Sequence, residues 1–202
     1  RPFKTVTRSK LINNIFFTEA LMQREEALNL VKKYVKNNNL IKHMLAAETV
    51  MKHFAARFGE DGSDWAIAGL VHDIDVEMTK DCPGLHGKKS AEILKANGFS
   101  DRIIEAVANH PKDEPMGDNM SKMLYSADQV TGLIVAGALI HPDKKLAAIN
   151  GDFIMKRFNE KRFAAGANRD RIKAVEKMGI PLSEFIDESL KAMQAIHSEI
   201  GL

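Results

Sequence analysis

Four histidines and two aspartates are the residues of this chain whose types and spacing could do chemistry. In chain order they are His43, His72, Asp73, His86, His110 and Asp128. Burying a carboxylate without a partner is costly. Four imidazoles and two carboxylates aimed at one interior therefore require a positive charge among them. We interpret the set as a metal centre, and imidazole with carboxylate ligands favours iron, manganese or a similar ion.

Each of these residues also has a simpler interpretation. A buried histidine or aspartate usually only finds a hydrogen-bond partner in the core, and His72-Asp73 as an adjacent pair is a weak motif by itself. The metal interpretation therefore depends on the whole set, in which several residues fall on the apolar faces of predicted helices.

The elements that would position the first ligands are predicted helices. Apolar residues recur at helical spacing from Leu40 to Phe58, and His43 shares their face. Ser63 is a suitable N-cap for the next helix, which leads to His72. Neighbouring side chains on a helix point about 100° apart. His72 and Asp73 can therefore approach an ion together from a helix end.

The remaining ligands fall on helices further along the chain. A helical segment opens at His86 and stops at Asn97-Gly98, and Ser100 is expected to cap the helix that ends near His110. The stretch from Met120 to Ile140 reads as a long, mostly apolar helix with Asp128 on its inward stripe.

The fold class that these patterns favour is all-α. No alternation of apolar and polar residues is long enough to predict a sheet, and Lys112 to Asn119 is the clearest loop. We expect a single-domain helical bundle with additional C-terminal helices. An N-terminal segment (1–24) precedes the metal-binding domain (25–150), and the C-terminal helices (151–202) pack on the same domain.

Composition limits the partners and the compartment. The chain has 202 residues, 45% of them hydrophobic, and a formal net charge of +2, so no strong field attracts it to nucleic acid or to a membrane. No apolar run approaches the roughly 20 residues that span a bilayer. The single cysteine, Cys82, cannot form an internal disulfide. We expect a cytoplasmic protein without nucleic-acid or membrane partners, for which a homo-oligomer is possible.

The order and types of these residues also resemble those of a known protein family. The order His43, His72-Asp73, Asp128 resembles the signature of the HD superfamily of metal-dependent phosphohydrolases. The run Leu70-Val71-His72-Asp73-Ile74-Asp75 is similar to the HDIG motif of that family, with Asp75 in place of glycine. The resemblance covers about Glu25 to Ile140. The GYP signature is absent, which argues against a cyclic-dinucleotide phosphodiesterase.

His86 and His110 match two additional histidines found in the dinuclear branches of that superfamily. Those branches include dinucleoside tetraphosphate hydrolases, HD-GYP phosphodiesterases and a few diiron oxygenases. The resemblance implies that Asp73 is the catalytic residue, bridging two ions. One ion would be completed by His43, His72 and Asp128, and the other by His86 and His110. If the last two histidines lie too far away, the site is mononuclear and they become substrate contacts or acids.

Several charged residues near these ligands have both a functional and a plain interpretation. Lys88 and Lys89 follow His86 at a helix start, where free N–H groups and lysine charge would suit a phosphate. Asp75, Glu77 and Asp81 could act as general acid or base. All five could equally be solvated surface residues.

A basic stretch lies beyond Asp152. It contains Arg157, Lys161, Arg162, Arg169, Arg171 and Lys173. A solvated face is the plain interpretation of this stretch. The alternative is that part of it folds over the metal site and binds the non-reacting part of a nucleotide.

The function that the resemblance implies is hydrolysis of a nucleotide or another small phosphate ester or anhydride at a centre of one or two divalent ions, Fe or Mn. Two classes of alternative stay open. The same ligands on iron could form an HD-type diiron oxygenase, and the chain could be a non-catalytic module that binds a metal or a nucleotide.

Overall fold

The computed structural model describes residues 23–160 and 162–202. Within those residues the chain forms helices and no strand, so the predicted all-α class is confirmed. The N-terminal segment expected over residues 1–24 falls almost entirely outside the described part of the chain.

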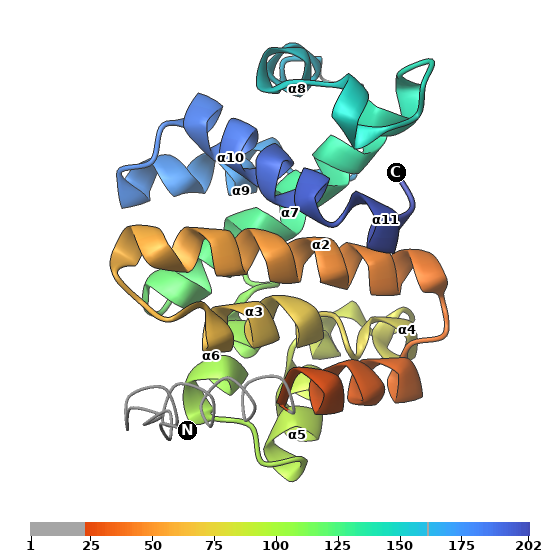
Figure 1. Ribbon diagram of the computed structural model, residues 1–202. Helices are drawn as coiled ribbons and strands as arrows, with labels where there is room; N and C mark the ends of the chain where they lie inside the picture. The colour runs from red at the N-terminus through yellow and green to blue at the C-terminus, as the bar shows by residue number, and fades with distance from the viewer. Residues whose placement is uncertain (1–22, 161) are drawn as a thin grey trace, which may run out of the picture.

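One helix, α2 (Asn38–Ala55), lies at the centre of the molecule, and the other long helices pack against it. The side chain of Asn37 caps α2 by accepting a hydrogen bond from the Asn39 amide at 2.9 Å. In Figure 1, α3 (Gly62–Val71) lies along one side of α2, while α7 (Asn119–Ile140) and α10 (Leu182–Ala195) lie on the other.

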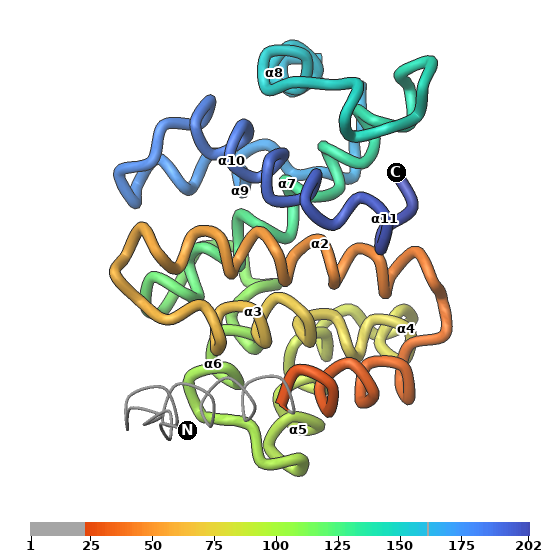
Figure 2. The backbone as a smooth tube through the Cα atoms, viewed as in Figure 1, coloured from red at the N-terminus to blue at the C-terminus, as the bar shows by residue number. Residues whose placement is uncertain are grey.

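The other helices complete the two sides of this arrangement. A helix over residues 23–34 leads into α2, and α4 (Val76–Thr79), α5 (Lys88–Ala96) and α6 (Asp101–Asn109) follow α3. The C-terminal segment forms α8 (Gly151–Phe158), α9 (Arg169–Lys173) and α11 (His197–Ile200), with α10 between the last two. Figure 2 shows this segment folding back over α2. Short 3₁₀ turns are η1 (Ala56–Phe58), η2 (Pro83–Leu85), η3 (Leu146–Ala148) and η4 (Ala174–Met178).

Two predicted helix starts are each wrong by two residues. The N-cap of α3 is Asp61 and not Ser63, because the Asp61 carboxylate accepts both the amide and the hydroxyl of Ser63 at 2.8 Å. Helix α5 begins at Lys88 and not at His86, since Gly87 takes a left-handed conformation with φ of 77°. The predicted cap of α6, Ser100, is confirmed by its bond from the Ile103 amide.

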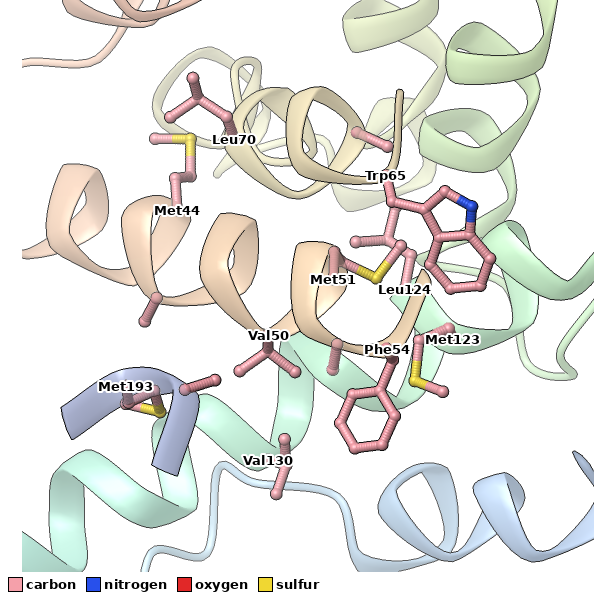
Figure 3. Close-up of a cluster of buried hydrophobic side chains, with 14 of the residues drawn as sticks. Met44, Val50, Met51, Phe54, Trp65, Leu70, Met123, Leu124, Val130 and Met193 are labelled. Atoms are coloured by element: carbon pink, nitrogen blue, oxygen red, sulfur yellow. The ribbon is translucent and has the colours of Figure 1, made fainter. Parts of the chain in front are cut away.

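The core lies on both sides of α2 and joins the C-terminal helices to the rest. Figure 3 shows Met44 of α2 beside Leu70 of α3, and Met51 of α2 beside Leu124 of α7. On the other side, Val50, Val130 and Met193 bring α2, α7 and α10 together. All of these side chains are fully buried or nearly so, so the C-terminal helices share one hydrophobic core with the helices before them.

Helix α7 corrects one expectation from the sequence. Its 22 residues are long and apolar enough, by length and composition alone, to cross a membrane, although no such run was predicted. The prediction considered only uninterrupted apolar runs. Polar residues such as Ser126 and Asp128 interrupt the run, but the helix as a whole stays apolar. Of its most apolar 18-residue window, 61% is buried inside the fold, as expected for a core helix.

The backbones of α3 and α2 come very close together in the core at Gly69. A Cβ atom added at Gly69 would lie 2.7 Å from the backbone carbonyl of Ala47 and from the amide nitrogen of Glu48. Real Cβ atoms do not approach backbone atoms so closely. Glycine at this position therefore allows the two backbones to touch, and the helices carry His43 and His72 at this crossing.

Replacing Gly69 by alanine should separate α2 from α3 and lower the free energy of unfolding by about 1–3 kcal/mol, because the clash involves rigid backbone. Urea denaturation of the parent and the G69A variant measures this change. The control is Gly132→Ala in α7, where an added Cβ meets nothing within 4 Å. G132A should gain about 0.5–1 kcal/mol from helix propensity. Equal loss in both variants would contradict the explanation.

Candidate metal centre

The structure brings all six predicted ligands together at one place in the helical bundle. Five regions of the chain supply them: the first half of α2, the end of α3, the turn before α5, the end of α6 and the middle of α7. The six residues are His43, His72, Asp73, His86, His110 and Asp128.

The first group within this cluster is formed by His43, His72 and Asp128. The Nε2 atoms of the two histidines lie 3.2 Å apart. The Oδ1 atom of Asp128 lies 3.2 Å from His43 Nε2 and 3.6 Å from His72 Nε2. The Oδ2 atom of Asp73 lies 3.7 Å and 3.5 Å from the same two nitrogens. His43, His72 and Asp128 thus form a group that could hold one ion, and Asp73 Oδ2 lies beside its two nitrogens.

The second group lies on the other oxygen of Asp73. Its Oδ1 atom is 3.3 Å from His110 Nε2 and 3.4 Å from His86 Nε2. Each carboxylate oxygen of Asp73 therefore faces a different pair of histidines. This is the arrangement that a carboxylate bridging two ions would have.

Two of the histidines are oriented by carbonyl groups of their own helices. His72 Nδ1 lies 2.8 Å from the Gly69 carbonyl oxygen, and His110 Nδ1 lies 2.6 Å from that of Val107. A carbonyl oxygen only accepts, so each Nδ1 carries the proton and donates it. Each Nε2 atom then points to the centre of the cluster.

The other two histidines are oriented by side chains. His43 Nδ1 lies 3.1 Å from Thr131 Oγ1. Because the Thr131 hydroxyl donates its proton to the Asp128 carbonyl at 2.8 Å, it accepts from His43. His86 Nδ1 donates to Asp75 Oδ1 at 2.7 Å. All four Nε2 atoms are therefore directed at the carboxylates of the cluster.

The donor set passes a direct test of fit for a cation. His110 Nε2 is buried and has no hydrogen-bond partner, and burial lowers the pKa of this histidine, so its lone pair faces Asp73 without a proton between them. The Nε2 atoms of His43 and His72 also lie only 3.2 Å apart. An unpaired buried acceptor such as His110 Nε2 is costly, and a divalent cation would satisfy it.

The electrostatics of the site favour positive charge. Although burial acts to lower it, the charges of Asp73 and Asp128 raise the pKa of His72 to about 9. Burial likewise opposes the bonds to Asp73 and Asp75 that raise the pKa of His86 to about 10. The pKa values of Asp73 and Asp128 are held well below their ordinary range by the neighbouring histidines, against the effect of burial. A metal ion would take the place of the histidine protons.

A cavity of about 290 Å³ opens beside the first group of ligands. Its walls come from α2, α7 and the segment between α8 and α9. The lining residues are His43, Asp128, Gln129, Gly132, Ala164, Gly166 and Ala167. Part of the C-terminal segment therefore lies next to two of the predicted metal ligands. The interpretation in which this segment folds over the metal site required such a position.

Gln129 connects Asp128 to this C-terminal segment, and the sequence reasoning missed it. Its Nε2 donates to Asp128 Oδ2 at 2.7 Å, and its Oε1 accepts from the Asn168 amide at 2.9 Å. The available signal was its position directly after a predicted ligand. The small residues at 164, 166 and 167 gave no signal, because nothing in their types predicts a place beside a ligand.

Three arginines of the basic stretch are engaged in holding that segment. Arg169 donates to the carbonyl groups of residues 158, 163, 164 and 167. Arg171 donates to the carbonyl oxygen of His110 and lies over the Tyr125 ring at 4.2 Å. Arg157 pairs with Glu160 at 2.7 Å. The plain interpretation of a solvated face is wrong for these three, whereas Arg162 and Lys173 are exposed, as it expects. Lys161 lies outside the described residues.

The start of α5 was considered as a phosphate site, but some of its N–H groups already have a hydrogen-bond acceptor. Asp75 Oδ2 accepts from the Gly87 and Ser90 amides at 2.8 and 2.9 Å, so these N–H groups of α5 are not free, contrary to expectation. Lys88 is exposed and Lys89 pairs with Glu92 at 2.6 Å. A role for the two lysines in substrate binding stays a prediction.

The three acids considered as general acid or base differ in their surroundings. Asp75 is fully buried and is not a solvated loop residue. Glu77 accepts hydrogen bonds from the Lys36 and Asn37 amides, so it holds the start of α2. Asp81 is exposed.

Comparison with known proteins agrees with this geometry. Residues 40–139 match the family model of the HD domain, and this range contains all six ligands. No solved structure matches the chain.

Several curated relatives carry the name Ribonuclease Y. The protein from Nitratidesulfovibrio vulgaris is 30% identical over 96 residues, or 48% of this chain and 18% of its own length. The protein from Chloroflexus aurantiacus is 30% identical over 94 residues, 46% of this chain and 18% of its own. That from Geotalea uraniireducens is 27% identical over 96 residues, again 48% and 18%. The chain thus spans about a fifth of the length of these relatives. By the HD domain over residues 40–139 the chain belongs to the HD superfamily.

Proposed function

We propose that the protein is a metal-dependent phosphohydrolase that acts on a nucleotide or another small phosphate ester or anhydride. The observation that carries this proposal is the position of the Asp73 carboxylate. Each of its two oxygens faces a separate pair of imidazole nitrogens at 3.3–3.7 Å. The HD-domain match supports it. Fe or Mn is the ion that the nitrogen and oxygen donors favour.

The residues of the chain would divide the work between them. His43, His72 and Asp128 would hold one ion, His86 and His110 the other, and Asp73 would bridge the two. When bound, two divalent ions supply Lewis-acid stabilisation of the attacking and leaving oxygens of a displacement at phosphorus. The chain itself fixes the positions of the ligands, since each histidine has its Nδ1 atom engaged and Asp128 is held by Gln129.

The cavity beside His43 and Asp128 is where the non-reacting part of the substrate would lie. Asp128 is the one charged side chain among the described residues that line it, apart from any charge on His43. The phosphate would therefore bind at the ions, with an uncharged group such as a nucleoside in the cavity. Lys88 and Lys89 would add charge to the phosphate from the start of α5.

The rival functions separate by substrate and by chemistry. Phosphate release without oxygen supports a phosphohydrolase, oxygen consumption an HD-type oxygenase, and ligand binding without turnover a non-catalytic module. The name of the relatives counts against the expectation of no nucleic-acid partner. The substrate panel therefore contains mononucleotides, dinucleoside polyphosphates and short RNA, assayed with and without oxygen after metal analysis.

Changing Asp73 to alanine should remove both bound metal and activity, because Asp73 is the one carboxylate within residues 23–160 and 162–202 that lies beside both histidine pairs. Elemental analysis after Mn loading and the release of phosphate measure the two effects. Asp81→Ala, at an exposed carboxylate, is the matched control and should keep both. Full metal content in D73A would show that the ligand assignment is wrong.

Filling the cavity should weaken substrate binding without changing the metal centre. Gly132 has open space at its Cβ position, so Gly132→Leu places a side chain in the cavity and should raise KM about tenfold or more. Metal content should stay at the parent value. Glu105→Leu, at an exposed position of α6, is the control. An unchanged KM in G132L would place the substrate elsewhere.

Removing both lysines at the start of α5 should weaken the contact with the phosphate. The Lys88→Ala, Lys89→Ala double variant is expected to lose about 1.5–3 kcal/mol of charge-assisted bonding, or one to two decades of kcat/KM, with metal content unchanged. Lys32→Ala, Lys33→Ala on the exposed face of helix 23–34 is the control. Kinetic constants equal to those of the parent would show that Lys88 and Lys89 are solvated surface residues without a role in substrate binding.

A further inference from the structure

Asp75 occupies the position at which the HDIG motif has glycine, and its side chain is completely buried. Both of its carboxylate oxygens are used. Oδ1 accepts from His86 Nδ1 at 2.7 Å, and Oδ2 accepts from the amides of Gly87 and Ser90 at 2.8 and 2.9 Å. A buried carboxylate is stable only when it is paired in this way, so Asp75 is built into the structure at this position.

The contacts of Asp75 show which ligand depends on it. His72 and His110 are each oriented by a carbonyl group three residues earlier in their own helix. His86 lies in the turn between η2 and α5, where no helical carbonyl is available to its ring. Its Nδ1 atom is instead bonded to Asp75. The carboxylate thus orients the imidazole, as the helix backbone does for the other two.

The same carboxylate also fixes the chain on either side of the ligand. It bonds the amide of Gly87, the residue after His86, and that of Ser90 in the first turn of α5. On the other face, a Cβ at Gly87 would lie 2.7 Å from Pro111 Cγ, so the turn is packed against the residue that follows His110. The ring, the turn and the helix start are therefore held by one side chain.

We propose that Asp75 is the positioning residue of the second ion site, holding His86 so that its Nε2 atom and that of His110 can bind one ion on Asp73 Oδ1. This inference rests on the metal centre proposed above and adds a residue that the ligand set does not contain. A carboxylate that accepts the second ring proton of a metal-binding histidine fixes the ring and raises its basicity, and loss of such a partner commonly weakens metal binding about 10–100-fold.

The test is the number and affinity of Mn ions bound by the whole chain, measured by equilibrium dialysis with elemental analysis. The parent is expected to bind two ions. Asp75→Ala should keep the first with an affinity within about threefold of the parent and bind the second about 10–100-fold more weakly. His86→Ala should give the same pattern. Asp75→Asn should also weaken the second ion, because one amide oxygen cannot serve both the imidazole and the helix start.

Asn150→Ala is the control for lost helix capping, since Asn150 caps α8 through the Phe153 amide and contacts no ligand. It should keep both ions even where it lowers the melting temperature. Two ions bound by D75A with parent affinities would overturn the inference, as would loss of both ions or a parent that binds only one. These readouts do not involve turnover. An inactive protein that binds two ions, and only one after D75A, would therefore refute the proposed activity and leave the role of Asp75 intact.

Discussion

The contact between the backbones of α2 and α3 at Gly69 is the constraint on which the rest of the structure depends. Because no side chain separates Gly69 from Ala47, the two helices lie close enough for His43 of one to meet His72 of the other at 3.2 Å. A residue with a side chain at position 69 would separate the first pair of ligands. The hydrophobic core around α2 then fixes this crossing from both sides, through α7 and α10.

Asp73 connects this helix contact to two further histidines. It directly follows the helix end at His72, so one of its oxygens faces His43 and His72 while the other faces His86 and His110. The carbonyl groups of helices orient the rings of His72 and His110, and a residue in a turn needs another partner for this. His86, the one histidine ligand in a turn, is also the one whose ring is oriented by a separate buried carboxylate.

The sequence predicted the all-α class and the meeting of the six histidines and aspartates, because repeating patterns and residue types reveal both. Helical spacing of apolar residues predicted the long helices, and histidine and aspartate at the ends and inner faces of helices predicted the cluster. The helix starts were missed where a neighbouring acid or glycine decided them, as at Asp61 and Gly87. The role of Asp75 was missed because a carboxylate in a turn is ordinarily solvated, and only the folded chain shows that three donors surround it.

One wall of the cavity beside His43 and Asp128 comes from Ala164, Gly166 and Ala167, beyond the segment that matches the HD domain. Those residues bind no part of the ligand set, and Arg169 holds their backbone through carbonyl groups whose presence does not depend on side-chain identity. Substitutions in this short segment can therefore change the shape offered to a substrate while the metal centre stays as it is. In such a chain the chemistry and the choice of substrate are free to evolve separately.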